Sequence, residues 1–117
     1  MQSHANGEIT VDIRNRVAHL TLNRPLALNA LSYEMVLAMA TLFTRWSRDD
    51  SIYVIVMGGA GEKSFCAGGD IRALRESAIN NGTLHHDFFV DEYRLDYQLH
   101  RYVKPIICLL DGIVMGG

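Results

Sequence analysis

Strict alternation of apolar and polar residues near the start of the chain predicts two β-strands. Ile9, Val11 and Ile13 alternate with polar residues, which is the period of a strand with one buried face. A second alternating stretch covers residues 18–22, after a short polar turn. The pattern therefore predicts a two-stranded hairpin, which ends by Pro25 because proline has no N–H to donate to a strand ladder.

The next pattern is helical. Ser32 is a candidate N-cap, and Glu34 lies in the first turn, where the helix dipole favours a negative charge. The apolar residues that follow recur on one helical face; they are Met35, Met39, Leu42, Phe43 and Trp46. This stripe predicts a helix that packs against the core and ends near Asp49.

Two continuous apolar runs, residues 52–57 and 106–110, have the composition of strands buried on both faces of a parallel sheet. Between them we expect a short helix from Asp70 to about Ala78 and a longer one from about Leu84 to Tyr102, which Pro105 stops. The order is hairpin, helix, strand, helices, strand. It predicts an α/β fold with parallel crossover connections.

Composition limits the functional classes. The chain has 117 residues, of which 49% are hydrophobic and 21% charged, as in one ordinary globular domain. Its net charge of −2 disfavours a nucleic-acid partner, and its apolar runs are too short to cross a membrane. No targeting segment is evident, so we expect a cytoplasmic protein. Cys66 and Cys108 are expected to be reduced thiols, and no residue spacing indicates a metal site.

Two glycine pairs are candidate sites of chemistry. Gly68-Gly69 and Gly116-Gly117 each follow a predicted buried strand. Glycine lets the backbone approach a ligand closely, so two such loops could direct two N–H groups at one oxygen and form an oxyanion hole. Tight turns are the commoner explanation of isolated glycine pairs.

Other catalytic patterns are weaker. The sequence supports neither a nucleophilic triad nor a phosphate-binding P-loop. Four carboxylates cluster on the second long helix: Asp87, Asp91, Glu92 and Asp96. Such a cluster is usually a solvated face, but Glu92 could instead turn inward, because aromatic and apolar residues surround it in sequence.

These stretches, taken together, resemble the enoyl-CoA hydratase/isomerase (crotonase) superfamily. The resemblance rests on residues 23–31 (NRPLALNAL), residues 64–71 (SFCAGGDI), Lys104-Pro105 before a strand, and Gly112 with residues 115–117. Within the superfamily, residues 88–95 (FFVDEYRL) are similar to a helix of the 3-hydroxyisobutyryl-CoA hydrolase group, with Asp91 where that group often has Glu.

The resemblance implies an acyl-CoA substrate, with coenzyme A as part of it and no separate cofactor. It implies that the N–H groups of Gly69 and Gly117 form the oxyanion hole, and that the conformation at Gly69 requires glycine. Glu92 would contact the acyl end. Further substrate contacts would come from Ala67, Gly68, Asp70, Ile71, Leu26, Ala27 and Leu28, although many relatives carry a charged residue in place of Leu26. The implied fold is a spiral of ββα turns, assembled as a trimer or hexamer.

The resemblance also implies that this chain is short. The family's domain is much longer, and its catalytic carboxylates lie after the third glycine of a Gly-Gly-Gly run. We therefore expect residues 1–117 to be the N-terminal part of a single crotonase-like domain whose C-terminal half is absent, and to be inactive alone. Three functions stay open: a 3-hydroxyisobutyryl-CoA hydrolase of valine catabolism, an enoyl-CoA hydratase or isomerase, and a catalytically silent fragment or assembly partner.

Overall fold

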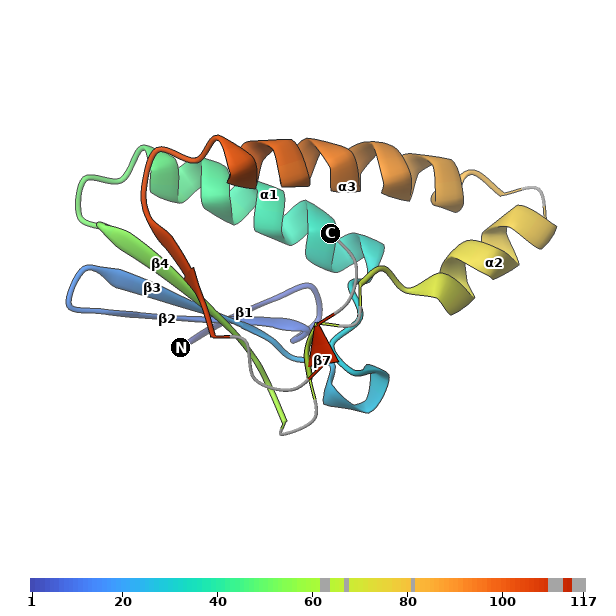
Figure 1. Cartoon of the computed structure of the whole chain (residues 1–117), viewed down its shortest axis with the longest axis horizontal. Coiled ribbons are helices and arrows are strands. Elements are labelled where there is room, and N and C mark those ends of the chain that lie inside the picture. Colours follow the sequence, from blue (N-terminus) through green and yellow to red (C-terminus); the bar gives the residue numbers. More distant parts are fainter. Residues whose placement is uncertain (62–63, 67, 81, 110–112, 115–117) are drawn as a thin grey trace.

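A computed structural model of the chain describes residues 1–61, 64–66, 68–80, 82–109 and 113–114. Its strands are β1 (Gln2–His4), β2 (Ile9–Arg14), β3 (Val17–Leu22), β4 (Val54–Gly59), β5 (Ser64–Cys66), β6 (Ile106–Cys108) and β7 (Ile113–Val114). Its helices are the 3-10 turn η1 (Pro25–Ala27), α1 (Tyr33–Ser47), α2 (Ile71–Ile79) and α3 (Leu84–His100). Figure 1 shows their arrangement.

The main sheet has the strand order β1-β2-β3-β4-β6. The β1, β2 and β3 strands are antiparallel neighbours, whereas β4 runs parallel to β3 and β6 runs parallel to β4. The predicted hairpin is confirmed, with Val11 opposite Leu20. The β1 strand was not predicted, because it is polar and has no apolar alternation; it pairs with β2 through its backbone, with Ser3 opposite Thr10.

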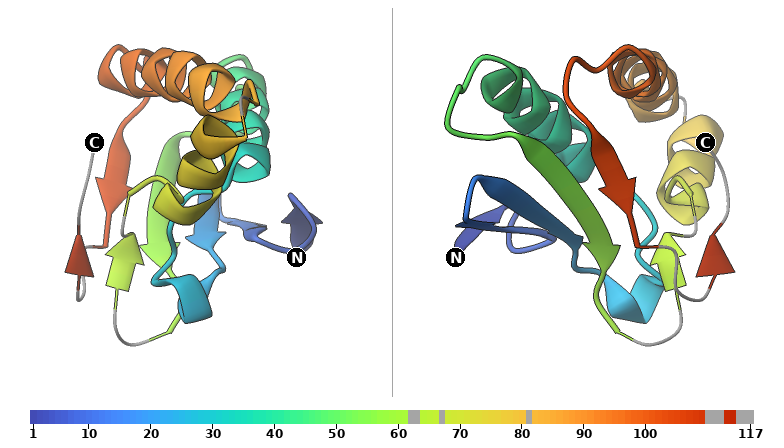
Figure 2. Two further views of the ribbon diagram at one scale, coloured as in Figure 1. Left: turned by 90° about the vertical axis from the view of Figure 1, so that its right-hand side faces the viewer. Right: turned by 60° about the vertical axis from the view of Figure 1, so that its left-hand side comes forward.

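The long helices lie together over one face of this sheet (Figures 1 and 2). The α1 helix is the crossover from β3 to β4, and α3 leads back to β6. A second, parallel pair of strands, β5 and β7, lies beyond the end of β4. The predicted α/β class with parallel crossovers is therefore confirmed.

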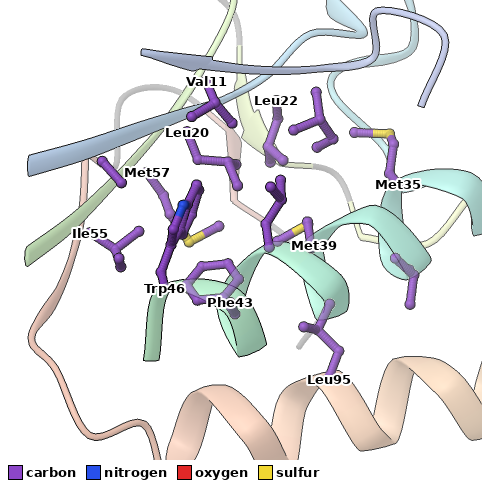
Figure 3. Close-up of a cluster of buried hydrophobic side chains, with 14 of the residues drawn as sticks. Val11, Leu20, Leu22, Met35, Met39, Phe43, Trp46, Ile55, Met57 and Leu95 are labelled. Carbon is purple, nitrogen blue, oxygen red and sulfur yellow. The ribbon is translucent and has the colours of Figure 1, made fainter. Parts of the chain in front are cut away.

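The core fills the space between the sheet and α1 (Figure 3). Every residue of the predicted α1 stripe is buried, from Met35 to Trp46, and it packs with Val11, Leu20 and Leu22 of the hairpin. The α3 helix adds Phe88 and Leu95 to this cluster. The helical spacing of the sequence thus correctly identified the face of α1 that becomes buried.

Both ends of α1 have side chains that stabilise them. The Ser32 hydroxyl accepts a hydrogen bond from the Met35 N–H at 3.2 Å, which confirms the predicted N-cap. At the other end, the Lys104 ammonium donates to the carbonyls of Trp46 and Asp49, at 2.5 and 2.6 Å. A positive charge is favoured there by the helix dipole. Lys104 therefore connects the segment before β6 to the end of α1.

The prediction that both apolar runs are buried on two faces is wrong. In the first run only Ile52, Ile55 and Met57 are fully buried, whereas Tyr53 is 57% exposed. Ile107 of β6 is 51% exposed. In the described part of the chain, helices cover only one face of the sheet, and β6 is its edge strand. No helix among the described residues is long and apolar enough to span a bilayer.

Candidate active site

A backbone bridge joins two distant loops at the centre of the candidate site. The Leu31 N–H donates to the Gly68 carbonyl at 2.7 Å, and the Asp70 N–H donates to the Leu31 carbonyl at 2.9 Å. Gly69 is therefore paired with Leu31 in parallel register. Successive N–H groups of an extended chain point to opposite sides, so the N–H of Gly69 points away from Leu31. This orientation is the one that a backbone donor to a ligand requires.

The two glycines of this loop are needed for different reasons. Gly68 has a φ of +86°, a left-handed conformation that glycine adopts readily and other residues do not. At Gly69 the constraint is space, because a Cβ would lie 3.0 Å from Cε1 of Phe88 and 3.4 Å from Oε2 of Glu92. The expected conformational requirement for glycine thus applies to Gly68, and Gly69 is required to be small.

The buried Cys66 side chain supports the turn at Gly68. The Gly68 N–H points to the Cys66 sulfur at 3.4 Å, and the cysteine is buried. Burial raises the pKa of the Cys66 thiol; the hydrogen bond from the Gly68 backbone opposes this rise, and the nearby Glu92 carboxylate adds to it. A raised pKa keeps the sulfur protonated at neutral pH, so Cys66 serves as a packing and hydrogen-bonding group and is a poor nucleophile.

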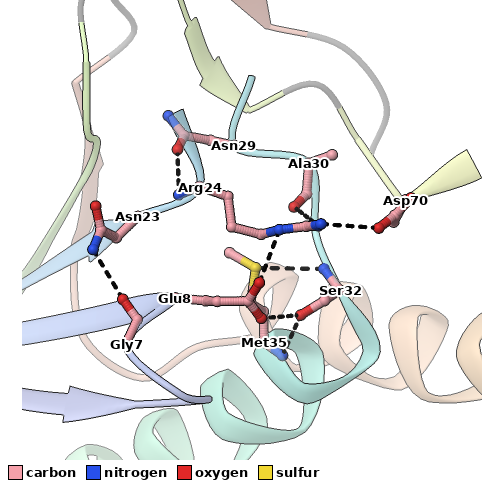
Figure 4. A network of polar contacts seen from close by, with 9 residues as sticks. All are labelled: Gly7, Glu8, Asn23, Arg24, Asn29, Ala30, Ser32, Met35 and Asp70. Carbon is pink, nitrogen blue, oxygen red and sulfur yellow. Dashed lines mark hydrogen bonds and ion pairs between the residues drawn. The ribbon is translucent and has the colours of Figure 1, made fainter. Parts of the chain in front are cut away.

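Arg24 connects the loop after β3 to the glycine loop (Figure 4). Its guanidinium donates to the Ala30 carbonyl at 2.8 Å and lies 3.0 Å from the Asp70 carboxylate. Its Nε is 2.9 Å from Glu8, whose other oxygen accepts from the Ser32 hydroxyl at 2.8 Å. One partly buried side chain thus connects the glycine loop to Glu8, just before β2, and through Glu8 to the start of α1.

Asn29 fixes the same loop from inside. It is fully buried and has a φ of +55°. Its side-chain oxygen accepts from the Arg24 N–H at 2.8 Å, and its amide donates to the Ala60 carbonyl at 2.9 Å. Buried polar groups are retained where they are hydrogen-bonded, and asparagine tolerates the left-handed conformation better than most residues.

A cavity of about 400 Å³ lies beside the glycine loop. Its lining is Leu22, Leu31, Met39, Met57, Cys66, Gly68, Glu92, Leu95, Asp96, Leu99, His100, Ile106 and Cys108. The walls are mostly apolar, and the ionisable groups Glu92, Asp96 and His100 enter from α3 at intervals of four residues. Such a combination of apolar walls and few polar groups is typical of a small-molecule site.

The carboxylates of α3 have separate environments. Asp87 is exposed, and Asp91 accepts a hydrogen bond from the Tyr33 hydroxyl at 2.5 Å. Glu92 and Asp96 are half-buried and line the cavity. The solvated-face interpretation therefore holds for Asp87 only, and Glu92 does turn inward. Burial raises the pKa of both cavity carboxyls, and the charge of Asp96 raises that of Glu92 further.

The remaining expected contact residues are spread along the two loops. Leu26 is fully exposed in η1, followed by the half-buried Ala27 and by Leu28, which has a φ of +52°. Ile71 is the first residue of α2, and the Asp70 carboxylate is engaged by Arg24. Ala67 and Gly117 lie outside the described residues. Among the residues that are described, no group of three or more His, Cys, Asp or Glu side chains could hold a metal ion.

Several site residues were not predicted from the sequence. Arg24 and Asn29 lie in a stretch that was noted, but nothing local shows that Arg24 reaches Asp70. The orientation of Asp96 was missed because this half of α3 has a weak apolar pattern in the sequence. Its neighbours Tyr93 and Tyr97, which could have been counted as apolar, are exposed. The four-residue spacing from Glu92 was the one signal available.

Comparison with known proteins decides the family. Residues 17–117 match the family model described as enoyl-CoA hydratase/isomerase. The chain belongs to this family. Its structural neighbours confirm the crotonase fold: a carnitinyl-CoA dehydratase from Mycobacterium thermoresistibile has a TM-score of 0.91 and 44% identity, over 95% of this chain and 33% of that one. An enoyl-CoA hydratase from Rhodobacter sphaeroides has a TM-score of 0.84 and 32% identity, over 90% and 32%.

Within the enoyl-CoA hydratase/isomerase family, curated relatives include mitochondrial 3-hydroxyisobutyryl-CoA hydrolases. The zebrafish protein, from Danio rerio, is 40% identical over all of this chain and 31% of its own length. The Rattus norvegicus protein is 42% identical over 100% and 31%, and the Gallus gallus protein is 44% identical over 84% and 26%. The chain thus spans less than a third of the length of these relatives.

Proposed function

We propose that the protein containing this chain is a CoA-thioester hydrolase that acts on 3-hydroxyisobutyryl-CoA. The structural observation that carries the proposal is the position of Glu92, whose Oε2 lies 3.4 Å from the site of a Cβ at Gly69. The Glu92 carboxyl therefore lies close to the backbone of Gly69, next to an apolar cavity that Glu92 and Gly68 line. The names of relatives that are 40–44% identical support the substrate.

In the proposed reaction, the thioester carbonyl oxygen accepts hydrogen bonds from the N–H groups of Gly69 and Gly117. A water oxygen attacks the carbonyl carbon, and these donors stabilise the negative charge that develops on the carbonyl oxygen. The carbon–sulfur bond then breaks, the sulfur takes a proton, and the products are a 3-hydroxy acid and free coenzyme A. Glu92 contacts the acyl end of the substrate.

The rest of the coenzyme A would lie along the two joined loops. Leu26, Ala27 and Leu28 supply one side, and Ala67, Gly68, Asp70 and Ile71 supply the other. The exposure of Leu26 supports this placement, because a ligand lying on η1 would cover it. Coenzyme A is then part of the substrate and no separate cofactor is needed. A trimeric or hexameric assembly is also proposed, and sedimentation of the intact protein would measure it.

The role of the Gly69 N–H is tested by two substitutions that differ in one group. Gly69→Ala keeps the N–H and adds a Cβ, whereas Gly69→Pro adds a ring and removes the N–H. In the intact protein, with folding checked by circular dichroism, the Pro variant should lose about a hundredfold more thiol-release activity than the Ala variant, because one oxyanion donor is missing. Equal losses in the two variants would show that the N–H has no catalytic role.

A hydratase or dehydratase is the second candidate, since the carnitinyl-CoA dehydratase is as similar in sequence as the hydrolases. The two chemistries give different products from one 3-hydroxyacyl-CoA. A hydrolase releases free thiol, whereas a dehydratase forms a conjugated double bond and leaves the thioester intact. Thiol titration and ultraviolet absorbance in the same reaction therefore distinguish them. Double-bond formation without thiol release would favour the second candidate.

A further inference from the structure

The ionisable groups of the cavity follow one line along α3. Glu92, Asp96 and His100 are four residues apart, so they lie on one helical face, and all three line the cavity. Glu92 approaches the Gly69 position, as described above. Asp96 is one turn further along, at a rise of about 6 Å. A short acyl chain whose carbonyl group lies at Gly69 would extend over a distance of this order.

Within the described part of the chain, no positively charged side chain pairs with the two cavity carboxyls. Among the described residues, neither Glu92 nor Asp96 has a hydrogen bond or ion pair, and the electrostatic interactions of Glu92 are with Asp96 and the Cys66 thiol. Burial disfavours the charged form of both groups. A partly buried polar group without a partner is costly, and a ligand that supplies a hydrogen bond to it is favoured.

The apolar residues that line the rest of the cavity limit the chemical class of ligand that can bind there. Leu31, Met39, Leu99 and Ile106 surround these carboxyls with apolar surface. A cationic ligand could pair with the carboxyls but would not match these walls. A small branched acyl group with one hydroxyl matches both features, because its carbons cover apolar surface and its hydroxyl can donate to one carboxylate and accept from a protonated carboxyl.

We propose that Asp96 is a specificity-determining residue that binds the hydroxyl group of a 3-hydroxyacyl thioester, with Glu92 as its neighbour in the same cavity. This inference rests on the proposed function for the position of the thioester, and goes beyond it by assigning the hydroxyl contact. An acyl chain of the same shape that lacks the hydroxyl leaves Asp96 desolvated and without a partner. A site built to bind a hydroxyl discriminates strongly against such analogues.

The experiment compares two ligands that differ only in the hydroxyl, 3-hydroxyisobutyryl-CoA and isobutyryl-CoA. Binding to the intact protein is measured by calorimetry, and hydrolysis by thiol release. The variants are Asp96→Leu, which removes the polar group, and Asp96→Asn, which keeps a hydrogen-bonding carbonyl. Asp87→Asn, on the exposed part of the same helix, is the matched control.

The unmodified protein should prefer the hydroxylated ligand by about a hundredfold or more, both in Kd and in kcat/KM. Asp96→Leu should reduce this preference at least about tenfold, partly by improving binding of isobutyryl-CoA, whereas Asp96→Asn and Asp87→Asn should retain most of it. An unchanged preference in Asp96→Leu, or in Asp96→Ala if the Leu variant does not fold, overturns the inference. The binding measurement separates the two proposals: a protein that binds with the expected preference but releases no thiol contradicts the hydrolase function only.

Discussion

The guanidinium of Arg24 lies 3.0 Å from the Asp70 carboxylate while it also donates to the Ala30 carbonyl at 2.8 Å. These two contacts lie on either side of the Leu31–Gly69 bridge. A single side chain therefore holds both loops whose backbone pairing orients the Gly69 N–H. Arg24 does not line the cavity beside Gly68, so its effect on catalysis would be indirect, through the position of that donor.

Replacing Arg24 should reduce both stability and turnover. Arg24→Met removes the charge that faces Glu8 and Asp70, and leaves two partly buried carboxylates without it. We expect a loss of about 2–3 kcal/mol in the free energy of unfolding. At a temperature where the variant is still folded, kcat should fall more than KM rises, because the donor is misplaced while the binding surfaces remain.

The matched control is the exposed Arg14–Asp12 pair, whose Arg14 side chain is 66% exposed. Arg14→Met should change the free energy of unfolding by less than about 1 kcal/mol and leave kcat unchanged. Urea denaturation and steady-state kinetics on the intact protein measure both quantities. Similar losses in the two variants would contradict a specific role for Arg24.

Gly68 and Gly7 provide a second matched pair, since both have a φ of +86°. Alanine at either position takes on the same backbone strain, which costs about 1–2 kcal/mol. A Cβ at Gly7 meets no atom within 4 Å. Both variants should therefore lose similar stability in thermal unfolding, but only Gly68→Ala should lower kcat/KM. A normal kcat/KM for Gly68→Ala would show that the turn tolerates the change without moving Gly69.

Glu92 should make the free energy of unfolding depend on pH, and the raised pKa of its carboxyl sets the direction of that dependence. Its pKa is raised above 4.5 in the folded protein, so above that pH the folded state binds more protons than the unfolded state. The free energy of unfolding then falls as pH rises through this range. The groups that share its cavity are Asp96, His100, Cys66 and Cys108.

Glu92→Gln removes this titration while keeping the shape of the side chain. The variant should match the unmodified protein below pH 4.5 and become the more stable of the two as pH rises above it, in thermal unfolding over a pH series. At the same time its kcat/KM should fall, because Glu92 is the proposed acyl contact. A stability difference that grows toward low pH would mean that the carboxylate form is favoured by folding.

A polypeptide made of residues 1–117 alone should release no thiol from 3-hydroxyisobutyryl-CoA above the buffer rate. The described residues place the Gly69 loop at the cavity but no activated nucleophile, and the relatives are more than three times as long. Ile107 and Leu109 of the edge are more than half exposed, so the polypeptide should also self-associate on size exclusion. Turnover by the monomeric polypeptide would place the whole catalytic machinery within these residues.

The secondary structure could be predicted because its signals are local. Three local patterns each favour the secondary structure that the fold contains. They are the five-residue apolar stripe of α1, the Ser32 cap and the alternation in β2 and β3. The incomplete burial of the second face of β4 could not be predicted, since an apolar run does not show how many layers cover a sheet. The exposure of Tyr53 reflects the arrangement of helices, which local sequence does not specify.

The candidate site was only partly predictable for a related reason. The resemblance singled out Gly69 and Glu92, and the structure shows that these two residues lie close together. The pairing of Leu31 with Gly69, and the reach of Arg24 to Asp70, depend on how the α1 crossover returns the chain to the sheet. The distinction between Gly68 and Gly69 is also tertiary, because Phe88 of α3 creates the limit on space at Gly69.

The ion pair between Arg24 and Asp70 joins residues that are 46 positions apart in the chain. The segment between them contains all of α1 and β4, so closing this contact has an entropic cost that only the assembled sheet and helix can offset. Non-local contacts of this kind slow folding. In refolding experiments, recovery of activity should therefore coincide with completion of the β3–β4 pairing, and helix formation detected by circular dichroism should not be sufficient for it.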